Sequence, residues 1–167
     1  MLLLLLAAAA PGHADRPPSP ACAAAERVVE DILTSSATQT SISGTPEPRF
    51  RGPAWKRARE LRQGGWSGPP PSVEVLDQWE RGEASTATTC VNVQAYIKAK
   101  GVSVDPASDA KQVRVAIAMP VVARSGAEAL VQVWTYRQPV GTSAYLHLLR
   151  KSAGRWSVIS RRLLAIS

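Results

Sequence analysis

The last third of the chain, residues 113–167, alternates apolar and polar side chains with a period of two residues. Because successive side chains of a β-strand point to opposite faces of the sheet, this period predicts strands with one buried face. Four such runs follow one another, at residues 113–121, 128–137, 144–151 and 155–166. The segments between them each contain a glycine, which favours hairpin connections. The pattern therefore predicts a four-stranded antiparallel meander sheet.

Helical patterns precede the predicted sheet. Between Ala21 and Ser35, apolar residues recur at helical spacing and charged residues occupy the opposite side. Ser72 is well placed to cap a later helix. The predicted helices span residues 21–35, 54–62, 72–81 and 90–100. Residues 88–93 also fit a strand, and residues 35–52, rich in Ser, Thr, Gly and Pro, are interpreted as a loop.

The length of 167 residues fits one domain. We expect residues 21–167 to form this domain, because residues 15–20 are a polar, proline-rich linker. The expected fold class is α+β, with N-terminal helices packed on the four-stranded antiparallel meander sheet.

The first residues form an uninterrupted apolar run, MLLLLLAAAA. The run is shorter than the roughly 20 apolar residues of a membrane span, and its length fits the hydrophobic region of a secretory signal. We therefore interpret residues 1–14 as a signal-peptide-like segment, although no Lys or Arg precedes the run. An exported protein, periplasmic or secreted, is expected. A lipid anchor at Cys22 is less favoured because the usual leucine three positions earlier is absent, and an internal Ala/Leu-rich helix is the structural alternative.

Cys22 and Cys90 are the only cysteines, and His13 and His147 the only histidines. Since a zinc site takes about four ligands, these residues predict no metal framework. In an oxidising compartment, a Cys22–Cys90 disulfide could tie the N-terminal segment to the body of the domain. In the cytosol, two thiols would be the simpler interpretation. No metal and no cofactor are predicted.

The net charge of +7 is concentrated in the predicted sheet. Residues 113–167 carry eight Lys/Arg and one Asp/Glu, a net of +7, whereas residues 1–112 balance to zero. A localised positive field attracts anions such as phosphates, acidic lipid head groups or acidic proteins, although arginines also protect sheet edges from aggregation.

A second basic segment, residues 49–62, contains six cations and Trp55. Basic residues with an aromatic among them are compatible with nucleic-acid binding. Because Glu47 and Glu60 dilute the charge, we favour a solvated helix and expect no nucleic-acid partner.

The turn residues predict how the strands pair. A three-residue loop at 124–126, with Gly126 at positive φ, would place Ala116 opposite Trp134. A wider loop at residues 138–142 would then align Trp134 with His147.

The last turn, residues 152–154, is expected to have three residues and to bring Leu148 beside Val158. Together the three registers divide the sheet into two faces, and a slip of one residue would exchange them. The first face, apolar throughout and expected under the helices, comprises Val113, Val115, Ile117, Met119, Val131, Val133, Leu146, Leu148, Trp156 and Val158.

The second predicted face mixes aromatic and polar side chains. Its members are Arg114, Ala116, Ala118, Gln132, Trp134, Tyr136, Tyr145, His147, Leu149, Ile159 and Arg161. A solvent-facing sheet surface is seldom this aromatic, which favours a contact: a small apolar or anionic ligand, a subunit interface, or a covering N-terminal loop. The candidate ligand- or partner-binding residues are Arg114, Trp134, Tyr136, Tyr145, His147 and Arg161. The expected partners are an anionic ligand, a component of the cell envelope, or a second copy of the chain.

No catalytic residue is predicted. A general base needs an oriented partner, usually a carboxylate, and the only carboxylate in the predicted sheet is Glu128, near a strand end. A hydrogen-bonded structural role is therefore the favoured interpretation of His147. The sequence also lacks a G-x-S-x-G motif, a phosphate-binding glycine loop, a C-x-x-C motif and a metal-spaced cluster.

The end of the chain carries two short motifs, Gly154-Arg155-Trp156-Ser157-Val158 and Leu164-Ala165-Ile166-Ser167. With them, residues 110–167 resemble the C-terminal part of small exported bacterial proteins of unknown function, in which a meander closes with G-x-W-x-V and an apolar strand. Helices before a curved antiparallel sheet are also similar to the nuclear-transport-factor-like cone fold. That resemblance implies small-molecule binding or lyase activity, but the acidic or histidine dyad of its enzymes has no counterpart here.

Two functions are therefore expected in order of preference. The first is a non-enzymatic, exported envelope module that binds through the basic, aromatic sheet face. The second is a cone-fold small-molecule carrier or enzyme that uses His147, Tyr145 and Tyr136. An acid within hydrogen-bond reach of His147 in a deep pocket would favour the second function.

Overall fold

A computed structural model describes nine helices and strands. The described residues are 19–35, 40–42, 58–81, 90, 93, 95, 97, 99, 113–137 and 141–166. The signal-like segment, most of the linker and the basic segment as far as residue 57 lie outside them.

Among the described elements, three helices and one short strand precede the main strands of the sheet. In chain order the elements are α1 (Pro20–Ser35), β1 (Thr40–Ile42), α2 (Ala58–Arg62), α3 (Val73–Arg81), β2 (Val113–Ile117), β3 (Val121–Val122), β4 (Glu128–Arg137), β5 (Gly141–Ser152) and β6 (Arg155–Ile166). Val93, Ala95, Ile97 and Ala99 are also helical. The α+β class is thus confirmed.

The helix ends follow local capping chemistry. Ser19 accepts the backbone N–H of Cys22 at 3.2 Å, which caps α1. Ser72 accepts the N–H of Val75 at 3.4 Å and caps α3, as its position predicts. The predicted helix 54–62 is seen only from Ala58, because its first residues lie outside the described part of the chain.

The sheet has six strands rather than the predicted four, in the order β1-β2-β4-β5-β6 with β3 beside β4. Its extra strand, β1, lies in the segment interpreted as a loop and pairs in parallel with β2. The first predicted strand is divided into β2 and β3 because Pro120 lies between them and has no N–H for the ladder. The long strands β4, β5 and β6 form the antiparallel meander.

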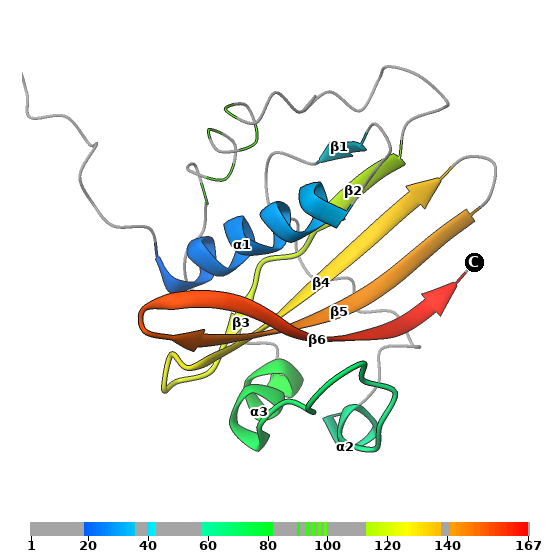
Figure 1. The fold of residues 1–167 in the computed structure, drawn as a ribbon. Helices are drawn as coiled ribbons and strands as arrows, with labels where there is room; N and C mark the ends of the chain where they lie inside the picture. Colours follow the sequence, from blue (N-terminus) through cyan, green and yellow to red (C-terminus); the bar gives the residue numbers. More distant parts are fainter. Residues whose placement is uncertain are drawn as a thin grey trace, which may run out of the picture.

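Helices cover both faces of the sheet (Figure 1). On one face α1 packs over a core that extends across β2, β4 and the start of β6. On the other face α2 and α3 pack against β3, β4 and β5. The expectation of a single apolar face was therefore wrong: Leu146 and Leu148 lie in the α3 core, whereas Leu149 and Trp156 lie in the α1 core.

Glu128 ties α3 to the sheet. Its carboxylate accepts the N–H of Ser72 at 2.9 Å and forms an ion pair with Arg150 at 2.7 Å. These contacts lower the pKa of Glu128 even though its burial acts in the opposite direction. These contacts also hold the beginning of α3 against the first residue of β4.

The predicted registers fail at two of the three connections. At the first hairpin, Gly126 has φ 69° and Ala116 lies opposite Trp134, as predicted. Its loop, however, has four residues, 124–127, rather than three, because Val122 pairs with Ala129. The next one places Trp134 opposite Ala144 rather than His147, because β5 already begins at Gly141 and the loop is shorter than expected. This shift of three residues is odd, so every side chain of β5 moves to the other face.

The β5–β6 turn has two residues rather than three. Ala153 and Gly154 both have positive φ, at 47° and 79°, and Ser152 pairs with Arg155. Leu149, not Leu148, therefore faces Val158. This second odd shift cancels the first for the beginning of β6, which is why Trp156 lies on the face that the sequence predicts.

Candidate functional site

The six predicted binding residues do not share one face of the sheet. Arg114, Trp134 and Tyr136 lie on the face that carries α3, since their register matches that of Leu146 and Leu148. The remaining candidates, Tyr145, His147 and Arg161, lie on the face of α1. The two groups are separated because the side chains of β5 point to the face opposite to the predicted one. The predicted aromatic, basic sheet surface therefore does not exist as one site.

The first group is divided between core and surface. Trp134 is 7% exposed and packs with Ala116, Ala118 and Ala144, so small residues make room for the indole. Arg114 lies 5.9 Å from the centroid of the Tyr136 ring, an exposed cation–π contact. This pair lies outside the core.

His147, of the second group, is 5% exposed and lies near Asp31 of α1. Its Nδ1 is 3.9 Å from Asp31 Oδ2, too far for a hydrogen bond, and has no partner among the described residues. Asp31 instead forms an ion pair with Arg161. Burial, assisted by the positive charge of Arg161, lowers the pKa of His147 to about 4, and Asp31 opposes this effect. The imidazole is therefore neutral at pH 7 and shielded from solvent.

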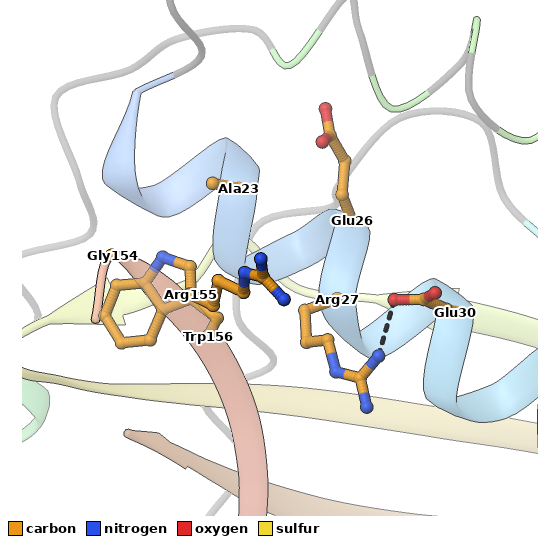
Figure 2. A pocket seen from close by; sticks show the side chains of 7 residues that line it. All are labelled: Ala23, Glu26, Arg27, Glu30, Gly154, Arg155 and Trp156. Atoms are coloured by element: carbon orange, nitrogen blue, oxygen red, sulfur yellow. Dashed lines mark hydrogen bonds and ion pairs between the residues drawn. The ribbon is translucent and has the colours of Figure 1, made fainter. Parts of the chain in front are cut away.

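A groove opens between α1 and the beginning of β6 (Figure 2). Its volume is about 460 Å³. The groove is lined by Ala23, Glu26, Arg27, Glu30, Gly154, Arg155 and Trp156. We call it the α1–β6 groove.

The local sequence explains the two walls of the α1–β6 groove. Residues 23, 26, 27 and 30 have the three- and four-residue spacing that puts side chains on one side of a helix. The other wall begins at the tight turn of Ala153 and Gly154, after which β6 presents Arg155 and Trp156. Gly154 supplies the second positive φ that such a two-residue turn requires.

Polar groups of the α1–β6 groove are only partly matched. Arg27 Nη1 donates to Glu30 Oε2 at 2.5 Å, whereas Arg27 Nε is buried with no partner in the described part of the chain. Trp156 Nε1 is likewise buried without a partner there. Burial raises the pKa of Glu26, and Figure 2 shows its carboxyl group directed away from the Arg27–Glu30 pair.

A further basic residue, Lys151, lies close to the indole of Trp156. Lys151 Nζ lies 5.8 Å from the centroid of the Trp156 ring. Arg155 extends its guanidinium along α1 in Figure 2, between Ala23 and Arg27. The groove thus combines an indole, N–H donors and a partly buried carboxyl group, which can hold a small ligand but lack a nucleophile with an adjacent base.

Cys22 and Cys90 are joined by a disulfide. Both are buried in the core that α1 forms with the sheet, and no free cysteine occurs among the described residues. Because Cys22 is in the first turn of α1, the bond holds the end of the helix that carries Ala23 and Glu26.

No protein-family model matches the chain, and no curated protein or solved structure matches it significantly.

The described residues contain no group of three or more His, Cys, Asp or Glu side chains placed to hold a metal ion. None of the helices in this part of the chain combines the length and the apolar character that a membrane crossing requires.

The α1–β6 groove is not apparent from the sequence. Its charged residues from α1 belong to the polar side of the helix predicted at residues 21–35, and Trp156 belongs to the predicted apolar face of the sheet. The available signal was the surplus of charged residues on one side of α1. Nothing in the sequence shows that the β5–β6 turn lies opposite that side, since their contact depends on tertiary packing.

Proposed function

We propose that the protein is an exported, non-enzymatic binding module of the cell envelope, and that its ligand occupies the α1–β6 groove. The observation that carries the proposal is the groove itself, in which a nearly buried indole and charged side chains from two elements surround about 460 Å³. This volume lies within the range of about 300–1,000 Å³ that is usual for small-molecule sites.

Export is supported by the cysteine chemistry. A buried disulfide between residues 68 positions apart is typical of oxidising compartments and rare in the cytosol. The signal-like run at the start of the sequence agrees with this assignment.

The compartment can be tested by expressing the full chain in a bacterium and separating cytosol, periplasm and medium. We expect the protein in the periplasm or medium, with an N-terminus near residue 15 and with thiols that react with an alkylating agent only after reduction. Recovery in the cytosol with two reactive thiols would contradict export.

Binding can be tested by screening the oxidised protein against small fragments of different charge by ¹H–¹⁵N NMR. Ligands of the α1–β6 groove should shift the amide signals of residues 23–30 and 154–156, together with the indole signal of Trp156. A Trp156→Phe variant assigns that signal among the five tryptophans of the chain. If fragments shift only other regions, the groove is not the binding site.

A second candidate function is a cone-fold carrier or enzyme that uses His147. Its support is the approach of Asp31 to within 3.9 Å of the imidazole. In this case a ligand must perturb the His147 ring signals, and His147→Asn must abolish binding. The binding module predicts that His147→Asn retains the ligand, since the imidazole is buried outside the groove lining.

A further inference from the structure

We propose that the ligand of the α1–β6 groove is a small organic anion, a carboxylate on an apolar body, held by Arg155 with the N–H groups of Arg27 and Trp156. This inference rests on the proposed function, because it names the chemistry of the same groove.

The groove offers hydrogen-bond donors that lack acceptors. Trp156 Nε1 can only donate, and so can every nitrogen of Arg27. Both Trp156 Nε1 and Arg27 Nε are buried with no partner among the described residues. A buried N–H without an acceptor costs free energy that an incoming carboxylate oxygen would recover. Since both nitrogen atoms are buried, the side chains of Arg27 and Trp156 must shift slightly to admit the carboxylate. Side-chain rotamer changes of this kind are common at binding sites.

Among the charged side chains that line the groove, Arg155 is the one that can receive an anion. From α1 come Glu26, Arg27 and Glu30, and from the β5–β6 hairpin comes Arg155. Arg27 and Glu30 compensate each other in an ion pair. Arg155 and Glu26 then remain. Because burial raises the pKa of Glu26, protonation of its carboxyl group leaves the charge of Arg155 for an anion.

Charge, not the shape of the guanidinium, distinguishes a carboxylate from a phosphate. A guanidinium can form two parallel hydrogen bonds with either anion. A doubly charged phosphate would suffer stronger repulsion from Glu26 and Glu30. The apolar part of the ligand would lie against Ala23 and the Trp156 ring, which also line the groove.

Glu26 makes this binding dependent on pH. Burial already raises the pKa of Glu26, and a ligand carboxylate nearby would raise it further, because two like charges disfavour the ionised form. Binding therefore takes up a proton at Glu26, and affinity increases as the pH falls from neutral toward the raised pKa. The other charged groups that line the groove are Arg27 and Glu30 of α1 and Arg155 of β6.

The test uses calorimetry on the oxidised full chain with phenylacetate, the uncharged phenylacetamide, 2-phenylethylammonium and phenyl phosphate. Phenylacetate should bind about tenfold more tightly than phenylacetamide, a difference of about 1.4 kcal/mol. Its affinity should be several-fold higher near pH 5.5 than near pH 7.5, in keeping with proton uptake by a carboxyl group. N-Acetyl-leucine is included because the carboxyl end of a peptide presents the same chemistry as a free acid. If N-acetyl-leucine binds more tightly than phenylacetate, the ligand is a peptide end; if phenylacetate binds more tightly, the ligand is a free acid.

Two variants and a matched control locate the effect. Arg155→Gln should weaken phenylacetate binding by about tenfold, as expected for loss of a charge-assisted pair. Arg114→Gln removes the same charge from the opposite face of the sheet and should change binding less than about twofold. Glu26→Gln should tighten binding near neutral pH and abolish its pH dependence.

The outcomes separate this inference from the proposed function. If phenylethylammonium or phenylacetamide shifts the groove signals as strongly as phenylacetate, the anion assignment fails while the binding module stands. If no probe shifts the groove signals, both fail. Equal losses for Arg155→Gln and Arg114→Gln would show only a long-range effect of net charge and would overturn the assigned contact.

Discussion

The imidazole of His147 lies between the sheet and α1, where it couples stability to pH. Its pKa is about 4 in the folded protein and 6.5 in an ordinary setting. Between these values the unfolded chain binds a proton that the folded chain does not, so the free energy of unfolding decreases as the pH falls through this window. The expected loss is on the order of 3 kcal/mol, complete near the folded pKa and absent above about pH 7.

Urea unfolding of the wild type and of His147→Asn at both ends of that window isolates this contribution. Other acidic groups titrate in both proteins and cancel in the comparison. The variant should lose less stability than the wild type on acidification, and superimposable pH profiles would contradict the assignment to His147.

Gln132 is a second polar residue in the core, on the opposite face. Its side chain is fully buried, and neither Oε1 nor Nε2 has a hydrogen-bond partner among the described residues. Gln132→Met keeps the length of the side chain and removes both unsatisfied groups, so we expect a gain of about 1–3 kcal/mol in unfolding free energy. Thermal or urea unfolding measures the change, and a loss of stability would mean that the amide is hydrogen-bonded in solution.

At the scale of elements, the β5–β6 turn sets the register of the longest hairpin. Ala153 has φ of 47°, a left-handed conformation in which a Cβ is disfavoured and asparagine is better tolerated. Ala153→Asn creates the Asn-Gly pair that two-residue turns of this kind prefer, and should increase the unfolding free energy by about 0.5–1 kcal/mol. Ala127→Asn, at an exposed residue outside the positive-φ region, is the control and should have little effect.

The same turn shows where prediction from the sequence stops. Periodicity located β4, β5 and β6 to within a few residues, because alternation is a property of each strand alone. Register is a property of the connection, and one loop shorter than expected moved His147 and Tyr145 to the face of α1. The strands were predicted correctly, but the error in register made the predicted binding face wrong.

At the scale of the whole molecule, the sequence does not show whether helices cover one face of the sheet or both. Half-polar strands suggested one buried face, yet α1 and the α2–α3 pair cover both. Ala116, Ala118 and Ala144 form a further buried cluster around the indole of Trp134, and such a cluster is not visible as a strict alternation. The groove arises only because α1 and the β5–β6 hairpin meet in this layered arrangement.

The disulfide is the covalent element of that arrangement. It joins the first turn of α1 to Cys90 across 68 residues, and α1 also supplies one wall of the α1–β6 groove and the Asp31 partner of Arg161. Removing a cross-link over a loop of this length enlarges the unfolded ensemble, so a Cys22→Ala/Cys90→Ala variant should lose about 2–4 kcal/mol of unfolding free energy.

Because the cross-link ends beside Ala23 and Glu26, the same change should loosen one end of α1. Amide hydrogen exchange should therefore increase in the first two turns of α1 more than in α3, which packs on the other face and is tied to Glu128 through Ser72. Addition of a reductant to the wild type must reproduce both effects. Equal exchange in α1 and α3 would show that the disulfide stabilises the fold as a whole without specifically holding the groove wall.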